Sequence, residues 1–209
     1  MIFDENSIDK LREDVKTRIS AKRYQHTLGV EEMAEHLGGI LMPEKLSELR
    51  VAALLHDIAK EIPYDEQVLL LRSSDLMYTE EDIATIPAIH SIAAVPVIIR
   101  DFPEYATDDV LSAVANHTLG SVGMSVFDEI ICISDYAEAG RTYPTCQAVR
   151  TYLLENISLN SSYEDNVKSL HIATLSSIDS TISSLEKRGE RIHSKTFSTK
   201  TYLENLIHG

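Results

Sequence analysis

The stretch AALLHDIAK, residues 52–60, places the adjacent polar pair His56 and Asp57 directly after four apolar or small residues. On a helix, neighbouring side chains point about 100° apart, so both would emerge from the same buried segment. A buried carboxylate beside a buried imidazole is costly unless the two are paired or bind a metal ion. Taken alone, the pair is more simply a satisfied polar contact in a core. Its significance therefore depends on the other polar residues of the chain.

Four further residues of metal-ligand type stand in apolar helical segments elsewhere: His26, His90, His117 and Asp135. Asp135, for example, lies in IICISDYA, residues 130–137, where a solvated carboxylate is out of place. Each residue alone is more simply a hydrogen-bonded core group. Buried polar groups need partners, however, and six of them are satisfied most simply if they share metal ions.

Apolar residues repeat with helical spacing almost throughout, and alternating strand patterns are essentially missing, which predicts an all-α helical bundle. In the first part of the chain we expect a helix carrying Ile8 to Ile19, one from His26 that stops at Gly38-Gly39, one from Leu46 through His56 that is ended by Ile62-Pro63, and one over 65–72. The middle of the chain should form a helix over 88–100 that is disturbed at Pro96 and a helix from Asp108 to about His117. The next helix should be opened by the capping pair Ser125 and Asp128 and ended by Gly140, and two more helices follow, the last reaching Gly189.

The chain shows no linker, repeat or abrupt change of composition, so we expect a single domain over residues 1–209. Its core would span about 19–157, with C-terminal helices over about 163–207 packed on it. The first residues, MIFDENSIDKLRED, lack the apolar run of a signal peptide, and no stretch approaches the roughly 20 apolar residues that span a bilayer. Cys132 and Cys146 lack metal-type spacing and are typical of a reduced protein, so we expect a cytoplasmic location without membrane contact.

The formal net charge of −14 argues against nucleic acid as the main partner, because such binding draws on many Lys and Arg contacts to phosphate. One small phosphorylated ligand is compatible with this charge if local cations offset the repulsion. Bound metal ions are cations of this kind.

The order His, His-Asp, His, His, Asp resembles the HD-domain phosphohydrolase superfamily, whose core is a five-helix bundle. Within it, the chain resembles the bacterial YqeK-type family of symmetrical bis(5'-nucleosyl)-tetraphosphatases. The motifs that carry this resemblance are RYQHTLGV (23–30), LLHDIAK (54–60), HTLG (117–120), SDYAEAGRTYP (134–144) and GERIHSKT (189–196). They extend over roughly residues 19–206, almost the whole chain.

The resemblance implies a site for two metal ions. His26, His56, Asp57 and Asp135 would hold one ion, and His90 and His117 the other, with Asp57 bridging both. Four imidazoles and two carboxylates suit transition metals better than magnesium, which prefers oxygen ligands and water. The resemblance implies iron, while the residues themselves leave manganese, cobalt and zinc open.

The implied activity is symmetrical hydrolysis of diadenosine tetraphosphate to two ADP, by attack of a metal-bridging hydroxide on phosphorus. The implied partner is thus a small nucleotide, a dinucleoside polyphosphate or an ADP- or GDP-like product, and a homodimer is expected at the family level. Asp57, Lys60 and Arg23 would be catalytic. The expected substrate contacts are Arg23, Lys60, Thr118, Glu138 and Arg141, although each of these is equally well explained as a solvated surface group.

Five positions depart from the family pattern: Ser91 replaces a usual glycine, Leu119 and Ser121 replace a threonine and a basic residue, and Ala137 and Ala139 replace an isoleucine and a proline. All six presumed ligands are intact, so the departures bear on substrate preference rather than on metal binding. Two alternatives stay open. One is a phosphohydrolase acting on another nucleotide, such as a mononucleotide or a guanosine polyphosphate, and the other is a metal- and nucleotide-binding sensor without useful turnover.

Overall fold

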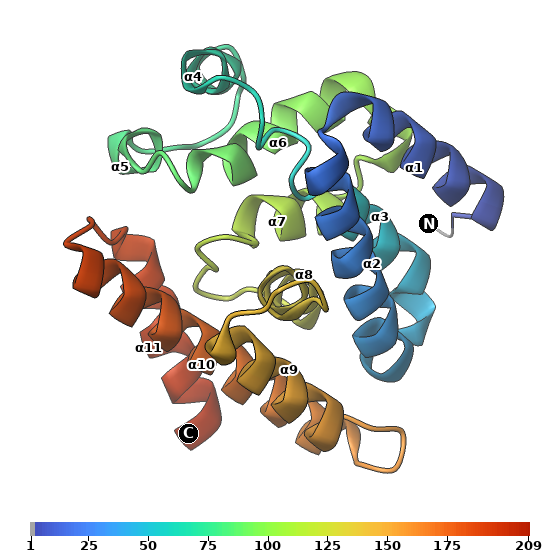
Figure 1. Ribbon diagram of the computed structural model, residues 1–209, viewed down its shortest axis with the longest axis vertical. Helices are drawn as coiled ribbons and strands as arrows, with labels where there is room; N and C mark the ends of the chain where they lie inside the picture. The colour runs from blue at the N-terminus through green and yellow to red at the C-terminus, as the bar shows by residue number, and fades with distance from the viewer. Residues whose placement is uncertain (1–2) are drawn as a thin grey trace.

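The computed structural model describes residues 3–209 and is all-α, with no β-strand in this part of the chain. Figure 1 shows the helices stacked in layers, with α8 near the centre. The α-helices are α1 (Glu5–Arg18), α2 (Ala21–Leu41), α3 (Leu46–Leu55), α4 (Tyr64–Arg72), α5 (Glu80–Ala84), α6 (Ile89–Asp101), α7 (Asp108–Asn116), α8 (Val126–Ala137), α9 (Pro144–Asn156), α10 (Tyr163–Arg188) and α11 (Ser194–His208). Short 3-10 turns η1 (Pro43–Lys45) and η2 (Pro103–Tyr105) precede α3 and α7.

Several helices follow the expectations from the sequence. Ser125 and Asp128 form the predicted capping box at the start of α8, each side chain bonding the other's backbone N–H. At the other end of the chain, Gly189 ends α10 as predicted, in the left-handed conformation with φ 64°. Helix α6 contains Pro96 in its interior, so the segment predicted as a disturbed helix is helical.

The predicted end of the second helix is wrong, because α2 continues through Gly38 and Gly39 to Leu41. Gly38 faces α3, where an added Cβ would lie 2.5 Å from Leu49 Cδ1. An interior glycine costs a helix about 1 kcal/mol relative to alanine. Here it permits the close packing of α2 on α3, which sequence reading cannot detect.

Two other boundaries differ from expectation, and two helices were not predicted. Helix α3 ends at Leu55, and His56 and Asp57 lie in the turns that follow, where Lys60 N donates to Asp57 O at 2.9 Å. Helix α8 ends at Ala137 rather than at Gly140. The short helix α5 and the separate helix α11 were not individually predicted, although α11 lies within the expected C-terminal helical region.

Helix α8 joins the parts of the molecule, because it packs against α2, α7, α9 and α10. The main core includes the fully buried Leu54, Leu55, Ile130 and Ile131. A smaller cluster, Met124, Ile178, Ile182 and Leu203, lies between α10, α11 and the loop before α8. Among the described residues, no helix combines the length and apolar character needed to cross a bilayer.

A buried ion network holds the three N-terminal helices together. Glu31 on α2 accepts from Arg12 of α1 at 2.6 Å and from Arg50 of α3 at 3.1 Å, and Arg50 also contacts Glu5 at 2.6 Å. Glu31 is only 4% exposed, so removing either arginine would leave a poorly compensated buried charge. The network fixes α2, which carries His26, relative to α3, which leads directly into His56.

Candidate metal centre

The six predicted ligands converge from five separate segments. His26 comes from α2, His56 and Asp57 from the turn after α3, His90 from α6, His117 from the end of α7 and Asp135 from α8. Within this cluster three groups have ligand atoms within 4.8 Å of one another: His26, His56 and Asp57; His56, His117 and Asp135; and Asp57, His90 and His117. His56 is fully buried, and Asp57, His90 and His117 are at most 3% exposed. The fold therefore assembles a compact buried set of nitrogen and oxygen donors.

Asp57 occupies the middle of the cluster and directs its two oxygens to different sides. Oδ2 lies 3.5 Å from His56 Nε2 and 3.8 Å from His26 Nε2. Oδ1 lies 3.1 Å from His90 Nε2 and 3.6 Å from His117 Nε2. One carboxylate thus links two groups of imidazoles.

The cluster divides into two halves about Asp57. We call His26, His56 and Asp135 the Asp135 half, in which Asp135 Oδ1 lies 3.0 Å from His26 Nε2 and 3.9 Å from His56 Nε2. We call His90 and His117 the His90 half, in which the two Nε2 atoms are 3.2 Å apart.

Backbone carbonyls orient two of the histidines. His56 Nδ1 lies 2.6 Å from Ala53 O, and His117 Nδ1 lies 2.7 Å from Val114 O. A carbonyl oxygen can only accept, so each Nδ1 donates and each Nε2 presents its lone pair to the cluster. Such an outer hydrogen bond fixes the tautomer and ring orientation that metal binding needs.

Glu138 orients the third histidine. Its Oε1 lies 3.2 Å from His26 Nδ1, and its other oxygen accepts from the backbone N–H of Gly140. A Cβ added at Gly29 would lie 2.5 Å from Glu138 Oε2, and one at Gly140 would lie 2.9 Å from the same atom. Two glycines therefore leave room for this carboxylate, which is only 4% exposed.

The donors fit a bound metal ion. His26 Nε2, His56 Nε2 and Asp57 Oδ1 are buried and have no hydrogen-bond partner among the described residues. Unpaired buried polar atoms are expensive, and these three belong to one cluster. Imidazole nitrogen with carboxylate oxygen is a donor set that suits divalent transition metals.

The protonation states also suit a cation. Burial raises the pKa of Asp57, but the close contacts of its carboxylate with the surrounding imidazoles outweigh this and hold the pKa well below its usual value. Burial likewise raises the pKa of Asp135, but its contact with His26 and the nearby positive charge of Arg141 hold it well below the usual range. Burial lowers the pKa of His90 to about 4, against the opposing effect of Asp57, so its imidazole is neutral. Two carboxylates are ionised around a neutral His90.

The predicted basic residues lie at the cluster. Arg23 Nη1 is 2.6 Å from Asp57 Oδ2, and Arg141 Nη2 is 2.7 Å from Asp135 Oδ1. Lys60 Nζ lies 3.2 and 3.1 Å from the two ring nitrogens of His90, and burial lowers its pKa. Thr118 Oγ1 is 3.2 Å from His90 Nε2. The cations therefore surround the carboxylates rather than pointing into bulk solvent.

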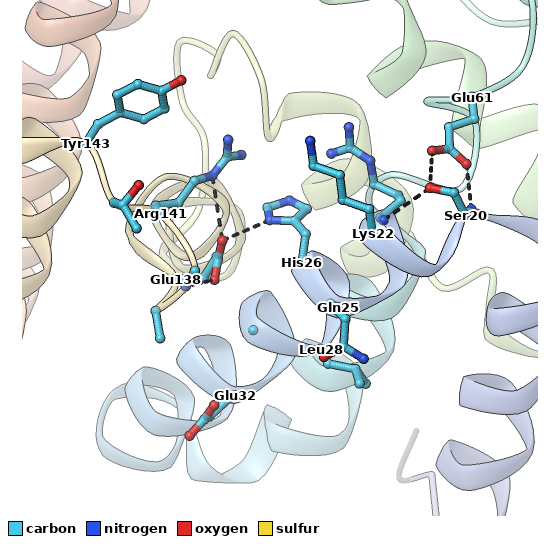
Figure 2. Close-up of a pocket in the computed structure, with 15 residues that line it drawn as sticks. Ser20, Lys22, Gln25, His26, Leu28, Glu32, Glu61, Glu138, Arg141 and Tyr143 are labelled. Atoms are coloured by element: carbon cyan, nitrogen blue, oxygen red, sulfur yellow. Dashed lines mark hydrogen bonds and ion pairs between the residues drawn. The ribbon is translucent and has the colours of Figure 1, made fainter.

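A cavity of about 870 Å³ opens beside His26, between the N-terminal part of α2 and the loop 138–143. Figure 2 shows His26 between Lys22 on one wall and Arg141 on the other, with Tyr143 beyond Arg141. Sequence reasoning assigned no role to Lys22 or Tyr143. Lys22 precedes His26 by one helical turn, and this spacing was the signal that the two residues share a face. Tyr143 lies in the motif SDYAEAGRTYP, but nothing in the sequence indicated a role for its side chain.

The remaining histidines lie outside the cluster. His36 and His208 are exposed. His171 Nδ1 is 2.8 Å from Glu129 Oε1, and His193 Nε2 is 3.1 Å from Asp82 Oδ1. Two of these imidazoles thus have carboxylate partners of their own.

Comparison with known proteins agrees with this geometry. The HD domain family matches residues 23–140, more than half of the chain. The symmetrical bis(5'-nucleosyl)-tetraphosphatase of Halalkalibacterium halodurans is 30% identical over 90% of this chain and 92% of its own length, and that of Bacillus subtilis is 28% identical over 90% and 93%. A crystal structure described as a predicted HD superfamily hydrolase involved in NAD metabolism, from Clostridium acetobutylicum, superposes with a TM-score of 0.81 at 27% identity, covering 99% of this chain and 100% of that one.

Proposed function

The chain belongs to the HD domain family and is a metal-dependent phosphohydrolase, and we propose that it hydrolyses diadenosine tetraphosphate symmetrically to two ADP. The names of the relatives support this substrate. The arrangement about Asp57 supports the chemistry, and it is the observation on which the proposal rests.

Asp57 offers one oxygen to each half of the cluster. We propose that the Asp135 half and Asp57 hold one divalent ion, and that the His90 half and Asp57 hold a second. Iron is the proposed metal, on the resemblance described above. Such ions would polarise phosphoryl oxygens and lower the pKa of a coordinated water, which supplies a nucleophile at neutral pH.

The chain's own residues would bind and orient the phosphates. Arg23 and Arg141 line the cavity and reach the cluster carboxylates, so a phosphate seated there lies within range of both guanidinium groups. Lys60 is placed on the His90 half, where its ammonium can take charge from the opposite end of a tetraphosphate bridge. Charged hydrogen bonds of this kind are worth about 1.5–3 kcal/mol each.

These cations explain how a chain with a large net negative charge can bind a polyphosphate. The chain as a whole carries −14, yet three basic side chains are concentrated within contact distance of the cluster. The binding of a polyanion is then local rather than a property of the whole surface. We further propose that residues 163–207 form part of the same single domain, since α10 packs on α8 and α9.

Product analysis tests the proposal. Purified protein with measured metal content is incubated with diadenosine tetraphosphate, mononucleotides and guanosine polyphosphates in water labelled with heavy oxygen. We expect ADP as the product of the dinucleotide, with one label in one of the two ADP molecules. ATP plus AMP would show cleavage at an outer phosphorus, and turnover of mononucleotides alone would reassign the substrate.

A further inference from the structure

We propose that the cavity beside His26 binds one nucleoside of the dinucleotide substrate together with its adjoining phosphate, with Tyr143 stacking on the base and Lys22 contacting that phosphate. This inference rests on the proposed function for the identity of the substrate. It assigns a nucleoside site to residues outside the metal cluster.

The position of the cavity follows from how the substrate must lie. Symmetrical cleavage requires the two inner phosphates at the cluster, so the two nucleosides extend away from it in different directions. The cavity begins at His26, a member of the Asp135 half, and includes Arg23 and Arg141. Its volume of about 870 Å³ lies within the range of roughly 300–1,000 Å³ for small-molecule pockets. It can therefore receive a nucleoside with its phosphate.

One wall of the cavity is a single face of α2. Lys22, His26 and Gly29 follow one another at helical spacing, so these residues share this face. Lys22 is exposed, and among the described residues it has no hydrogen-bond or ion-pair partner. Of the three acids that line the cavity, Glu61 accepts from Ser20 at 2.6 Å and Glu138 contacts His26, while Glu32 is exposed. In a chain with 33 acidic and 19 basic residues, an unpaired lysine beside an arginine-lined cavity favours an anionic ligand.

The opposite wall carries an aromatic ring. Tyr143 lies directly before α9, next to Arg141 in Figure 2, and the residue is 69% exposed. Pro144, the first residue of α9, follows it and restricts the backbone at this position. An exposed aromatic face held by a rigid backbone is suited to stacking on a nucleobase, which is sequence-tolerant because every base has a π face.

The test compares a ligand that carries nucleosides with one that carries none. Affinities of a methylene-bridged, non-hydrolysable diadenosine tetraphosphate and of inorganic tetraphosphate are measured by calorimetry on the metal-containing protein. Tyr143→Ala should weaken the dinucleotide about tenfold and change inorganic tetraphosphate by less than about twofold. Tyr143→Phe should retain the wild-type ratio, and Lys22→Gln should weaken the dinucleotide by about three- to tenfold.

Tyr163→Ala is the matched control, because Tyr163 is also exposed, at 53%, but lies outside the cavity. An unchanged dinucleotide affinity in Tyr143→Ala would overturn the proposal, as would equal weakening of both ligands. Equal affinity of the two ligands for the wild-type protein would also overturn it. Product analysis tests the proposed function separately. If the wild-type protein forms ADP but Tyr143→Ala leaves the dinucleotide affinity unchanged, the nucleoside site is rejected and the proposed function stands.

Discussion

The Asp135 half and the His90 half of the cluster share Asp57 but have different surroundings. The Asp135 half has a carboxylate of its own and opens into the cavity, where Glu138 orients His26. The His90 half has two imidazoles, no second carboxylate within its group, and the ammonium of Lys60 at 3.1 Å from His90. The difference is electrostatic: the Asp135 half contains a carboxylate of its own, which Arg141 contacts at 2.7 Å, whereas the His90 half contains only imidazoles and lies beside Lys60.

This difference implies unequal roles for two chemically similar sets of histidines. A carboxylate contributes charge as well as a donor atom, so the Asp135 half should bind a divalent ion more tightly. The His90 half depends on Asp57 for its negative charge. Substitution of Asp57, which both halves share, and of residues that belong to one half only should separate these roles.

Asp57→Ala should have the largest effect, because it removes the only carboxylate common to both halves. We expect turnover to fall by at least about three orders of magnitude, with loss of metal from both halves. Steady-state kinetics and elemental analysis on the same preparation measure both. His36→Ala is the matched control, since His36 is exposed and away from the cluster. Equal losses from the two substitutions would contradict the ligand assignment.

His90→Ala should come next and should distinguish the halves. We expect turnover to fall by at least roughly a hundredfold while about one metal ion per chain is retained in the Asp135 half. In the wild-type protein, titration with a chelator should remove one ion before the other. Loss of both ions in a single step, from either experiment, would show that the halves do not bind metal independently.

Arg141→Ala should slow cleavage of diadenosine tetraphosphate by roughly ten- to hundredfold without removing metal, because it removes a charged phosphate contact. The measurement is kcat/KM together with metal content. Arg188→Ala serves as the control, since Arg188 is an exposed arginine paired with Glu190. A parallel loss of metal would mean that Arg141 acts mainly through its 2.7 Å contact with Asp135.

Glu138→Gln should have the smallest effect, lowering metal affinity by about tenfold, because it weakens the group that orients His26. Gly29→Ala should act similarly, since its Cβ would displace the Glu138 carboxylate, a flexible side-chain end. That substitution should nevertheless preserve or raise thermal stability, because alanine favours a helix over glycine by about 1 kcal/mol. Metal titration and thermal unfolding measure the two effects.

Glu32→Gln is the control for this pair, because Glu32 lines the same cavity without contacting His26. Unchanged metal affinity in both Glu138→Gln and Gly29→Ala would show that the hydrogen bond to His26 has no influence on the metal. A large loss of stability in either variant would instead make the role of Glu138 structural.

The sequence by itself determined the helical class and the set of polar residues at the site. Helical periodicity and caps such as Ser125 with Asp128 depend on residues three or four apart, so they can be read locally. Likewise, His26, His90, His117 and Asp135 stood out because each interrupts an apolar helical pattern. The family and its phosphohydrolase activity followed from the order of these residues.

Only the tertiary structure decided how these residues face one another. The continuation of α2 through Gly38 depends on Leu49 of α3, and the position of Glu138 depends on Gly29, 109 residues earlier in the chain. The division of Asp57 between two halves likewise requires helices α2, α6, α7 and α8 to converge. Such contacts arise from packing between distant segments, and local spacing carries no information about which side-chain atoms then meet.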